Sequence, residues 1–382
     1  MFAKASERRS YAAERPHPFM IIFGIESSCD DTAAAVIDTE NCSAPGKYRL
    51  LSNIVSSQTD IHAIYGGVVP ELASRCHAEA ISHVASEALR CAGVTPADID
   101  AIAVTFGPGL IGSLLVGVSF AKALASALSI PLIPVNHIEA HAAAVLVEHP
   151  DIRPPYLSLI ISGGHTSFYR IDKNFVFTEL GSSRDDAAGE AFDKVGRFMG
   201  LPYPGGAAMD RLAAAGMCRD SYKLIRFPSP AIGNALEFSF SGLKTAVINF
   251  LHTESERRNL SSASELPLEL REDTAAALNA VVVDAIISKL RTALENCPYS
   301  ALVLAGGVAA NSHIRQAASA LCDEMKIEFI TPPPSLCADN GAMTAAAGAE
   351  LYSSGITAGS NLNAFASDES VCAYLEKLRQ SK

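Results

Sequence analysis

The sequence predicts an α/β protein built from two similar domains, each a mixed sheet flanked by helices, with a central cleft between them. Apolar runs of strand length alternate along the chain with longer stretches of helical periodicity. Segments 24–38 (GIESSCDDTAAAVID) and 159–172 (LIISGGHTSFYRID) also resemble each other. In both, an apolar strand is followed by a turn of small residues, a threonine and a second strand ending in Ile-Asp. This self-similarity indicates a duplicated unit.

The first domain is predicted over residues 20–150. Its strands are expected in the apolar runs 19–27, 32–38, 49–58, 101–106 and 131–136. Helices are expected over 70–92, which opens with a proline, and over 113–128, which follows the glycine-rich turn GPGLIG.

The second domain is predicted over residues 155–335. Its strands are expected at 156–164, 166–172, 175–181, 301–307 and 327–334, and its helices near 185–200, 207–216, 266–296 and 311–321. A C-terminal helix, assigned to 339–382, is expected to return and complete the first domain, and its helical pattern covers 338–352.

Length and composition narrow the class of protein. The 382 residues suffice for two domains with a large core. The net charge of -11 argues against a broad nucleic-acid-binding surface and leaves room for a local basic patch. Nine cysteines without a C-x-x-C pair favour reduced thiols over a disulfide framework or a zinc ribbon.

Residues 1–19 are polar and basic and are expected to form a flexible extension, so Met20 is an alternative start to Met1. A transit peptide would be poor in acids, whereas Glu7 and Glu14 are present. The cytoplasm is therefore the expected location, with mitochondrial targeting as the minor alternative. No membrane segment is expected, because Lys122 and Pro131 interrupt the apolar stretch that precedes residue 136.

The stretch HIEAH at 137–141 places His137 and His141 one helical turn apart, where both can bind one cation. In the zinc-protease pattern H-E-x-x-H, the glutamate directly follows the first histidine and acts as general base. Here Glu139 lies about 200° around a helix from His137 and is expected to point away from a metal. Two ordinary histidines on an alanine-rich helix remain an open alternative. Asp339, the expected N-cap of the last helix, is the best third ligand, and a cap without a metal role is its alternative.

Two glycine-rich turns are candidate anion sites. In ISGGHT at 161–166, Gly163 and Gly164 would let backbone N–H groups approach an anion, and a plain hairpin turn is the alternative. In AGGVAANSHIR at 305–315, a strand leads through Gly-Gly into a helix N-terminus, which suits a phosphate or a nucleotide.

Two further patterns match known motifs only in part. GPGLIG at 107–112 fits G-x-G-x-x-G, but the next strand ends in Asn136 and not in the acid that dinucleotide binding requires, so a tight turn lining the cleft is the preferred interpretation. SGLK at 241–244 fits S-x-x-K, but the companion motifs of penicillin-interacting enzymes are absent, so it is interpreted as a chance match.

The order of these motifs resembles a known family. They are GIESSCDDTAAAV, GGVVPELASR, TFGPGLIGSLLVG, NHIEAH, SGGHT, DDAAGEAFDKV, YPGG, FSFSGLKT, AGGVAAN and CADNGAM. From Met20 to about Leu351 the chain resembles the tRNA N6-adenosine threonylcarbamoyltransferases (TsaD, Qri7 and Kae1), once called O-sialoglycoprotein endopeptidases. That family has the fold shared by actin, hexokinase and Hsp70, the ASKHA fold. The chain departs from it at Ala140, where many members have glycine, and in the N-terminal extension.

The resemblance implies specific site residues. The metal ligands would be His137, His141 and Asp339, holding one divalent ion, Fe²⁺ in the first place and Zn²⁺ or Mg²⁺ as alternatives. The substrate and nucleotide contacts would be Ile160, Ile161, Ser162, Gly163, Gly164, Asp193, Gly206, Asp210 and Asn311. The base stays open, with Glu26, Asp30 and Asp31 expected at the mouth of the first unit, where a proton acceptor could lie.

The resemblance also implies a reaction and partners. The threonylcarbamoyl group of threonylcarbamoyl-AMP would pass to N6 of adenosine 37 in tRNAs that read codons beginning with A. Bacterial relatives work with an inactive TsaB-like paralogue and a TsaE-like P-loop ATPase, whereas the mitochondrial form works alone as a homodimer. The alternatives are a small-molecule kinase of the same superfold and a catalytically silent scaffold paralogue. A protease ranks last because of the position of Glu139.

Overall fold

The computed structural model describes residues 20–39, 48–149, 151–233 and 236–380. The predicted extension 1–19 lies outside the described residues. The chain divides into two compact units. The first comprises the chain up to Gln58, Val69–Asp151 and the part from Asp339 on, and the second comprises Thr59–Val68 and Ile152–Ala338. Thr59–Val68 thus groups with the second unit, although it lies within the range expected for the first domain.

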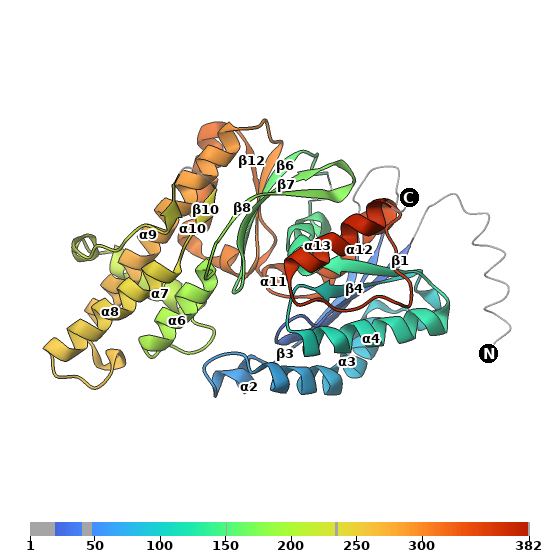
Figure 1. Ribbon diagram of the computed structural model, residues 1–382, viewed down its shortest axis with the longest axis horizontal. Coiled ribbons are helices and arrows are strands. Elements are labelled where there is room, and N and C mark those ends of the chain that lie inside the picture. The colour runs from blue at the N-terminus through green and yellow to red at the C-terminus, as the bar shows by residue number, and fades with distance from the viewer. Residues whose placement is uncertain (1–19, 40–47, 150, 234–235, 381–382) are drawn as a thin grey trace. The chain divides into compact units, whose positions relative to one another are not determined.

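The first unit contains a five-stranded mixed sheet in the order β3-β2-β1-β4-β5 (Figure 1). The strands are β1 (Ile21–Glu26), β2 (Asp31–Asp38), β3 (Arg49–Ser57), β4 (Ala101–Gly107) and β5 (Leu132–Asn136). β2 is antiparallel to both β1 and β3, whereas β1, β4 and β5 run parallel. The carboxyl ends of β1, β4 and β5 therefore meet at one edge of the sheet, which is where ligands bind in sheets of this kind.

Helices cover both faces of this sheet. They are α3 (Pro70–Ala92), α4 (Ile111–Leu128), α5 (His137–Ala143), α12 (Gly341–Ser353) and α13 (Asp368–Gln380), with short 3₁₀ turns at Pro96–Asp98 and Ala144–Val147. Neighbouring residues of β1 point to opposite faces. Gly24 lies against Gly341 and Ala345 of α12, whereas Ile25 lies near Gly117 of α4. Gly24 has no room for a side chain, because a Cβ there would collide with the backbone of α12.

The second unit repeats this arrangement, with strand order β12-β11-β6-β7-β8 (Figure 1). Its strands are β6 (Tyr156–Ile161), β7 (Thr166–Asp172), β8 (Val176–Ser182), β11 (Ala301–Ala305) and β12 (Glu328–Ile330). β7 is antiparallel to both of its neighbours, and β6, β11 and β12 are parallel. The two sheets therefore have the same topology, which confirms the duplication predicted from the two similar segments. A separate hairpin pairs β9 (Ala231–Ile232) with β10 (Glu237–Phe238).

The second unit contains a continuous apolar core. Its helices are α2 (Thr59–Ala63), α6 (Ala188–Phe198), α7 (Gly206–Met217), α8 (Ser241–Arg257), α9 (Leu268–Glu295), α10 (Ser312–Met325) and α11 (Pro334–Cys337), with 3₁₀ turns at Lys173–Phe175, Ser221–Leu224, Ala263–Glu265 and Gly307–Ala310. Leu159 of β6, Leu304 of β11, Val195 of α6 and Leu278 of α9 belong to this core. Burial of such side chains is the main stabilising contribution to the unit.

The C-terminal region differs from the prediction in two respects. The assignment of 339–382 to one C-terminal helix is wrong, because the pattern over 338–352 forms α12 and a separate helix, α13, follows it. The N-cap of α12 is Asn340, whose side-chain oxygen accepts a hydrogen bond from the Met343 N–H, and not Asp339. The shift matters because it moves Asp339 out of the capping position.

Helix α4 is the one described helix that is long and apolar enough to cross a membrane. It connects the parallel strands β4 and β5 and packs on β4 and α3. These contacts are those of a helix that covers a sheet.

Candidate metal centre and substrate-contact residues

The short helix α5 begins directly where β5 ends. Asn136, the last residue of β5, caps the helix by accepting a hydrogen bond from the Ile138 N–H at 2.8 Å. All seven residues of α5 are buried. His137 and His141 are therefore held on a rigid helix at the carboxyl edge of the parallel strands, where a ligand site is expected.

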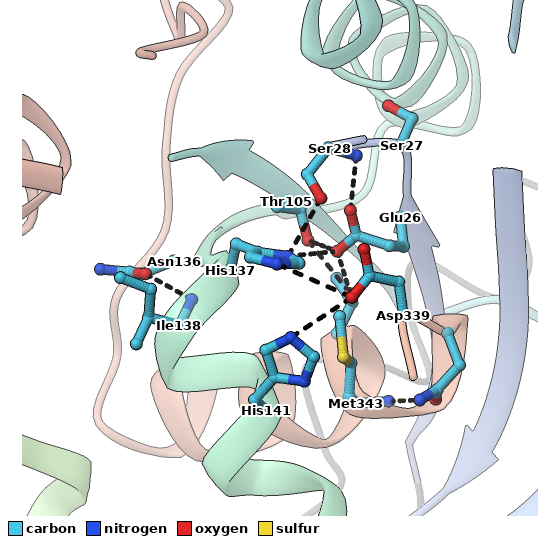
Figure 2. A network of polar contacts seen from close by, with 12 residues as sticks. Glu26, Ser27, Ser28, Thr105, Asn136, His137, Ile138, His141, Asp339 and Met343 are labelled. Carbon is cyan, nitrogen blue, oxygen red and sulfur yellow. Dashed lines mark hydrogen bonds and ion pairs between the residues drawn. The ribbon is translucent and has the colours of Figure 1, made fainter. Parts of the chain in front are cut away.

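His137, His141 and Asp339 lie together in the first unit (Figure 2). Asp339 Oδ1 is 3.3 Å from His141 Nε2 and 3.7 Å from His137 Nε2, and the potential ligand atoms lie within 4.8 Å of one another. Both histidines are buried, and Asp339 is partly exposed. The structure thus brings together three residues that are far apart in the sequence. We call them the His-His-Asp group.

The state of His141 indicates that the group fits a metal ion. Although Nε2 lies near Asp339, neither ring nitrogen of His141 has a hydrogen bond in the described part of the chain, and both are buried. A buried polar atom without a partner is costly and calls for an explanation such as a bound ion. Two imidazoles and one carboxylate suit a divalent transition metal and leave coordination positions open.

Glu26, the last residue of β1, is entirely buried behind His137. Its Oε1 accepts a hydrogen bond from the Ser28 N–H at 2.6 Å, and its Oε2 accepts one from the Thr105 hydroxyl at 2.6 Å. Oε2 also lies 3.4 Å from His137 Nδ1. The expectation that Glu26 lies at the mouth of the unit is therefore wrong, because the carboxylate is enclosed by β1, β4 and α5.

Electrostatics couples Glu26, His137 and Asp339. Burial alone would raise the pKa of Glu26, but the adjacent His137 more than offsets it, so the pKa lies below its ordinary value. Burial opposes a charge on His137, but Asp339 and Glu26 together raise its pKa to about 9. Without a metal ion, His137 is therefore an imidazolium between two carboxylates. A metal bound at Nε2 would replace the proton there.

Glu139 takes no part in the His-His-Asp group. Its carboxylate is buried, and Oε1 forms a long ion pair with Arg379 of α13 at 4.0 Å. Burial raises the pKa of Glu139 to about 7, with partial relief from Arg379. The side chain points away from the His-His-Asp group, as expected from its position around the helix relative to His137. It contributes instead to the contact between α5 and α13.

The SGGHT turn of the second unit is a tight hairpin between β6 and β7. The Ser162 N–H donates to the His165 carbonyl at 2.8 Å, and the His165 N–H donates to Ser162 Oγ at 3.1 Å. Side chains built at Gly163 and Gly164 would meet no atom of the described residues within 4 Å. The turn therefore presents bare backbone to open space, as a site for close approach to an anion requires.

The two glycine-rich regions of this unit are in contact. Gly306 of the AGG motif has φ 91°, and a Cβ there would collide with the Ile161 carbonyl oxygen. Gly189, near the start of α6, similarly packs on the Ser162 carbonyl oxygen. Ile160 and Ile161, two of the predicted substrate-contact residues, are buried in β6. Their side chains pack in the core, and they precede the turn directly in the sequence.

The predicted nucleotide contacts are engaged in local hydrogen bonds. Asp193 Oδ1 accepts from the Gly205 N–H at 2.8 Å, next to Gly206 at the start of α7. Asp210 accepts from the Ser312 N–H and hydroxyl and lies 3.2 Å from His313 Nδ1. Asn311 caps α10 and donates to Asn279 Oδ1. Asp210 thus contacts Ser312, the residue after Asn311, whereas Asp193 contacts the backbone of the YPGG turn.

The sequence interpretation missed the polar residues that surround His137. Ser28 Oγ lies 3.1 Å from His137 Nδ1 (Figure 2). Thr105 Oγ1 lies 3.1 Å from Thr344 Oγ1. Ser28 follows β1, Thr105 lies near the end of β4 and Thr344 lies in α12, where serine and threonine give no particular signal in the sequence. Their convergence depends on how β1, β4 and α12 pack.

Comparison with known proteins identifies the relatives of the chain. The family described as tRNA N6-adenosine threonylcarbamoyltransferase matches residues 49–346. The protein of that name from Geotalea uraniireducens is 47% identical over 346 residues, covering 90% of this chain and 95% of its own length. The one from Caldicellulosiruptor saccharolyticus is 45% identical over 346 residues, covering 90% of this chain and 97% of its own.

A solved structure supports the fold independently of close sequence similarity. The crystal structure of HypF from T. kodakarensis has a TM-score of 0.56 at 14% identity, covering 89% of this chain and 48% of that chain. At this identity the likeness concerns the fold alone, and it agrees with the predicted duplicated fold shared by actin, hexokinase and Hsp70. With the family match over residues 49–346 and relatives at 45% and 47% identity, the chain belongs to the tRNA N6-adenosine threonylcarbamoyltransferase family.

Proposed function

We propose that this protein transfers a threonylcarbamoyl group from threonylcarbamoyl-AMP to N6 of an adenosine in tRNA, at position 37 of tRNAs that read codons beginning with A. The observation that carries the proposal is the family match over residues 49–346, which includes all three members of the His-His-Asp group. A scaffold protein that kept only the fold and had lost catalysis would not need the buried His-His-Asp group.

The chemistry explains why an activated donor is needed. The exocyclic amine of adenine is a poor nucleophile, because its lone pair is delocalised into the ring. In the transfer, N6 forms a bond with the carbamoyl carbon while the bond from that carbon to the phosphate oxygen breaks. AMP leaves with the electron pair, and the N6 proton passes to an acceptor.

The His-His-Asp group would hold the metal. A bound divalent ion acts as a Lewis acid that polarises a carbonyl or phosphoryl oxygen of the donor. Fe²⁺ is our first choice and Zn²⁺ the second, since both accept imidazole ligands, whereas Mg²⁺ prefers oxygen. Glu26 touches His137 and so belongs with the metal group, and Asp30 and Asp31 remain candidates for the proton acceptor.

The second unit would hold the nucleotide part of the donor. The bare backbone at Gly163 and Gly164 suits donor oxygens, because nothing obstructs close approach there. Gly206 is equally open. Asp210, already paired with Ser312 and His313, would accept hydrogen bonds from ribose hydroxyls.

Partner proteins would supply the positive charge for tRNA binding that this acidic chain lacks. Binding of tRNA depends on neutralising phosphates, and the net charge of this chain is -11. We propose a TsaB-like inactive paralogue and a TsaE-like P-loop ATPase as partners in the cytoplasm, with a homodimer as the alternative.

The test is to deplete the protein in its host and measure nucleosides from bulk tRNA by mass spectrometry. N6-threonylcarbamoyladenosine should fall and unmodified adenosine should rise at position 37. Re-expressed wild-type protein should restore the modification, and His141→Ala should not. His252→Ala, which changes an exposed histidine of α8, is the matched control and should restore it. An unchanged nucleoside level after depletion would contradict the proposed function.

A further inference from the structure

We infer that Glu26 is a positioning residue for the metal site: its carboxylate holds His137 through Nδ1, so that Nε2 faces His141 and Asp339. The inference rests on the proposed metal site and is independent of the transferred group and of tRNA. Figure 2 shows the His137 ring next to the carboxylates of Glu26 and Asp339, with dashed lines from the ring to both.

The distances define the orientation of the ring. His137 Nδ1 is 3.4 Å from Glu26 Oε2, and His137 Nε2 is 3.7 Å from Asp339 Oδ1. The two nitrogens of one imidazole thus face two different carboxylates. A histidine that ligates a metal through one nitrogen commonly donates its other N–H to a carboxylate, which fixes the ring and its tautomer. Glu26 has the chemistry and the place for that role.

Glu26 is itself held rigidly. The Ser28 N–H occupies Oε1, and the Thr105 hydroxyl occupies Oε2. Thr344 Oγ1 also lies 3.4 Å from Oε2 and 3.1 Å from Thr105 Oγ1. Thr344 is in the first turns of α12, the helix that directly follows Asp339 and Asn340. The same carboxylate therefore connects the strand β4, the histidine of α5 and the helix that follows the acidic ligand.

A purely structural role does not account for this environment. A carboxyl group that is fully buried needs polar partners for its oxygens. Among the described residues, the side chain that forms an ion pair with Glu26 is His137, and no lysine or arginine does so. Ser28 Oγ also approaches His137 Nδ1, but the Ser28 backbone is bound to Glu26, so the carboxylate positions both groups.

The test is metal binding by the full-length, metal-free protein with Co²⁺ as the probe, followed by its visible absorption and by calorimetry. Glu26→Gln keeps the size of the side chain and removes its charge. We expect its Kd for Co²⁺ to rise about 10–100-fold, with an altered Co²⁺ spectrum. Glu350→Gln is the matched control, because Glu350 is a partly buried carboxyl of the same unit that accepts a hydrogen bond from the Tyr48 hydroxyl and does not belong to the metal group. It should bind Co²⁺ as the wild type does.

A wild-type Kd and spectrum in Glu26→Gln would overturn the inference. If circular dichroism shows that this variant is unfolded, Glu26→Asp takes its place. The aspartate keeps the charge but withdraws the carboxylate by one methylene, so Co²⁺ binding should again weaken, and unchanged binding would overturn the inference. His141→Ala separates the two proposals: it should lose Co²⁺ binding if the metal site is real, whatever group the enzyme transfers.

Discussion

The side-chain amide of Asn136 donates a hydrogen bond to Asp368 Oδ1 at 3.0 Å, across 232 residues of sequence. Asn136 caps α5, and Asp368 is the first residue of α13. This contact and the ion pair between Glu139 and Arg379 connect the C-terminal helix to the helix that carries both histidines. Packing of Phe106 against Phe365 and Tyr374 reinforces the connection.

The first prediction concerns this capping contact. Aspartate is as good an N-cap as asparagine, so Asn136→Asp would be harmless in an isolated helix. Here it would face Asp368, and we expect a loss of about 1–2 kcal/mol in the free energy of unfolding, measured by chemical denaturation of the metal-free protein. Asp368→Asn in the same chain should restore most of that loss. Equal stability of the single and double variants would show that the contact has no energetic role.

The second prediction concerns the effect of metal on thermal stability. Co²⁺ at about 100 times its Kd should stabilise the wild type by about 2.7 kcal/mol. In differential scanning fluorimetry this shift should be absent in His141→Ala. Because neither ring nitrogen of His141 has a hydrogen bond among the described residues, the metal-free variant should melt within a few degrees of the metal-free wild type. A large fall in the Tm of the metal-free variant would mean that His141 is mainly a packing residue.

The third prediction is a pH dependence of stability caused by Asp31. Burial raises the pKa of Asp31 to about 7, from an ordinary value of 3.8, and its Oδ1 has no hydrogen bond to any of the described residues. The folded protein therefore binds a proton that the unfolded chain releases between these values. The stabilisation from this proton is complete below about pH 4 and is lost as the pH rises through about 7.

Asp31→Asn removes this titration and should make the protein more stable than the wild type at pH 8, by about 1–3 kcal/mol. Near pH 4 the two should be nearly equal. Denaturation curves at both pH values measure the difference. Asp323→Asn, an exposed site on α10, is the control and should give the same small difference at both. A gain for Asp31→Asn that does not grow with pH would contradict the assignment.

The fourth prediction distinguishes a glycine needed for the fold, Gly306, from a glycine needed for donor binding, Gly163. Gly306→Ala should cost more than about 2 kcal/mol, because φ is 91° and the new Cβ would strike the Ile161 carbonyl oxygen. Gly163→Ala should leave the Tm nearly unchanged, since nothing lies near the added methyl group. If the donor lies over this turn, Gly163→Ala should nevertheless lower transfer to tRNA at least tenfold. Full activity of that variant would place the donor elsewhere.

Local sequence patterns determined most of the secondary structure. Apolar runs with turn residues at their ends became the strands of both sheets, because short buried strands depend mainly on neighbouring residues. Pro70 and Gly93 mark the two ends of α3 as expected of a helix with proline at its start and glycine after its end. The spacing of His137 and His141 likewise determined that they share a face of α5, and the position of Glu139 excluded it from that face.

Tertiary packing decided the rest. α13 was not predicted as a separate helix, because it buries only Val371 and Leu375 and is otherwise rich in charged residues, so its apolar periodicity is weak. Asp339 and Asn340 are adjacent and both are good N-cap residues, so the local sequence does not determine at which of them α12 begins. The contact of Glu26 with His137 spans 111 residues and exists only because β1 and β5 end at the same edge of one sheet. Residue spacing along the chain determines which side chains share a helix face, whereas strand order and helix packing determine which distant side chains meet.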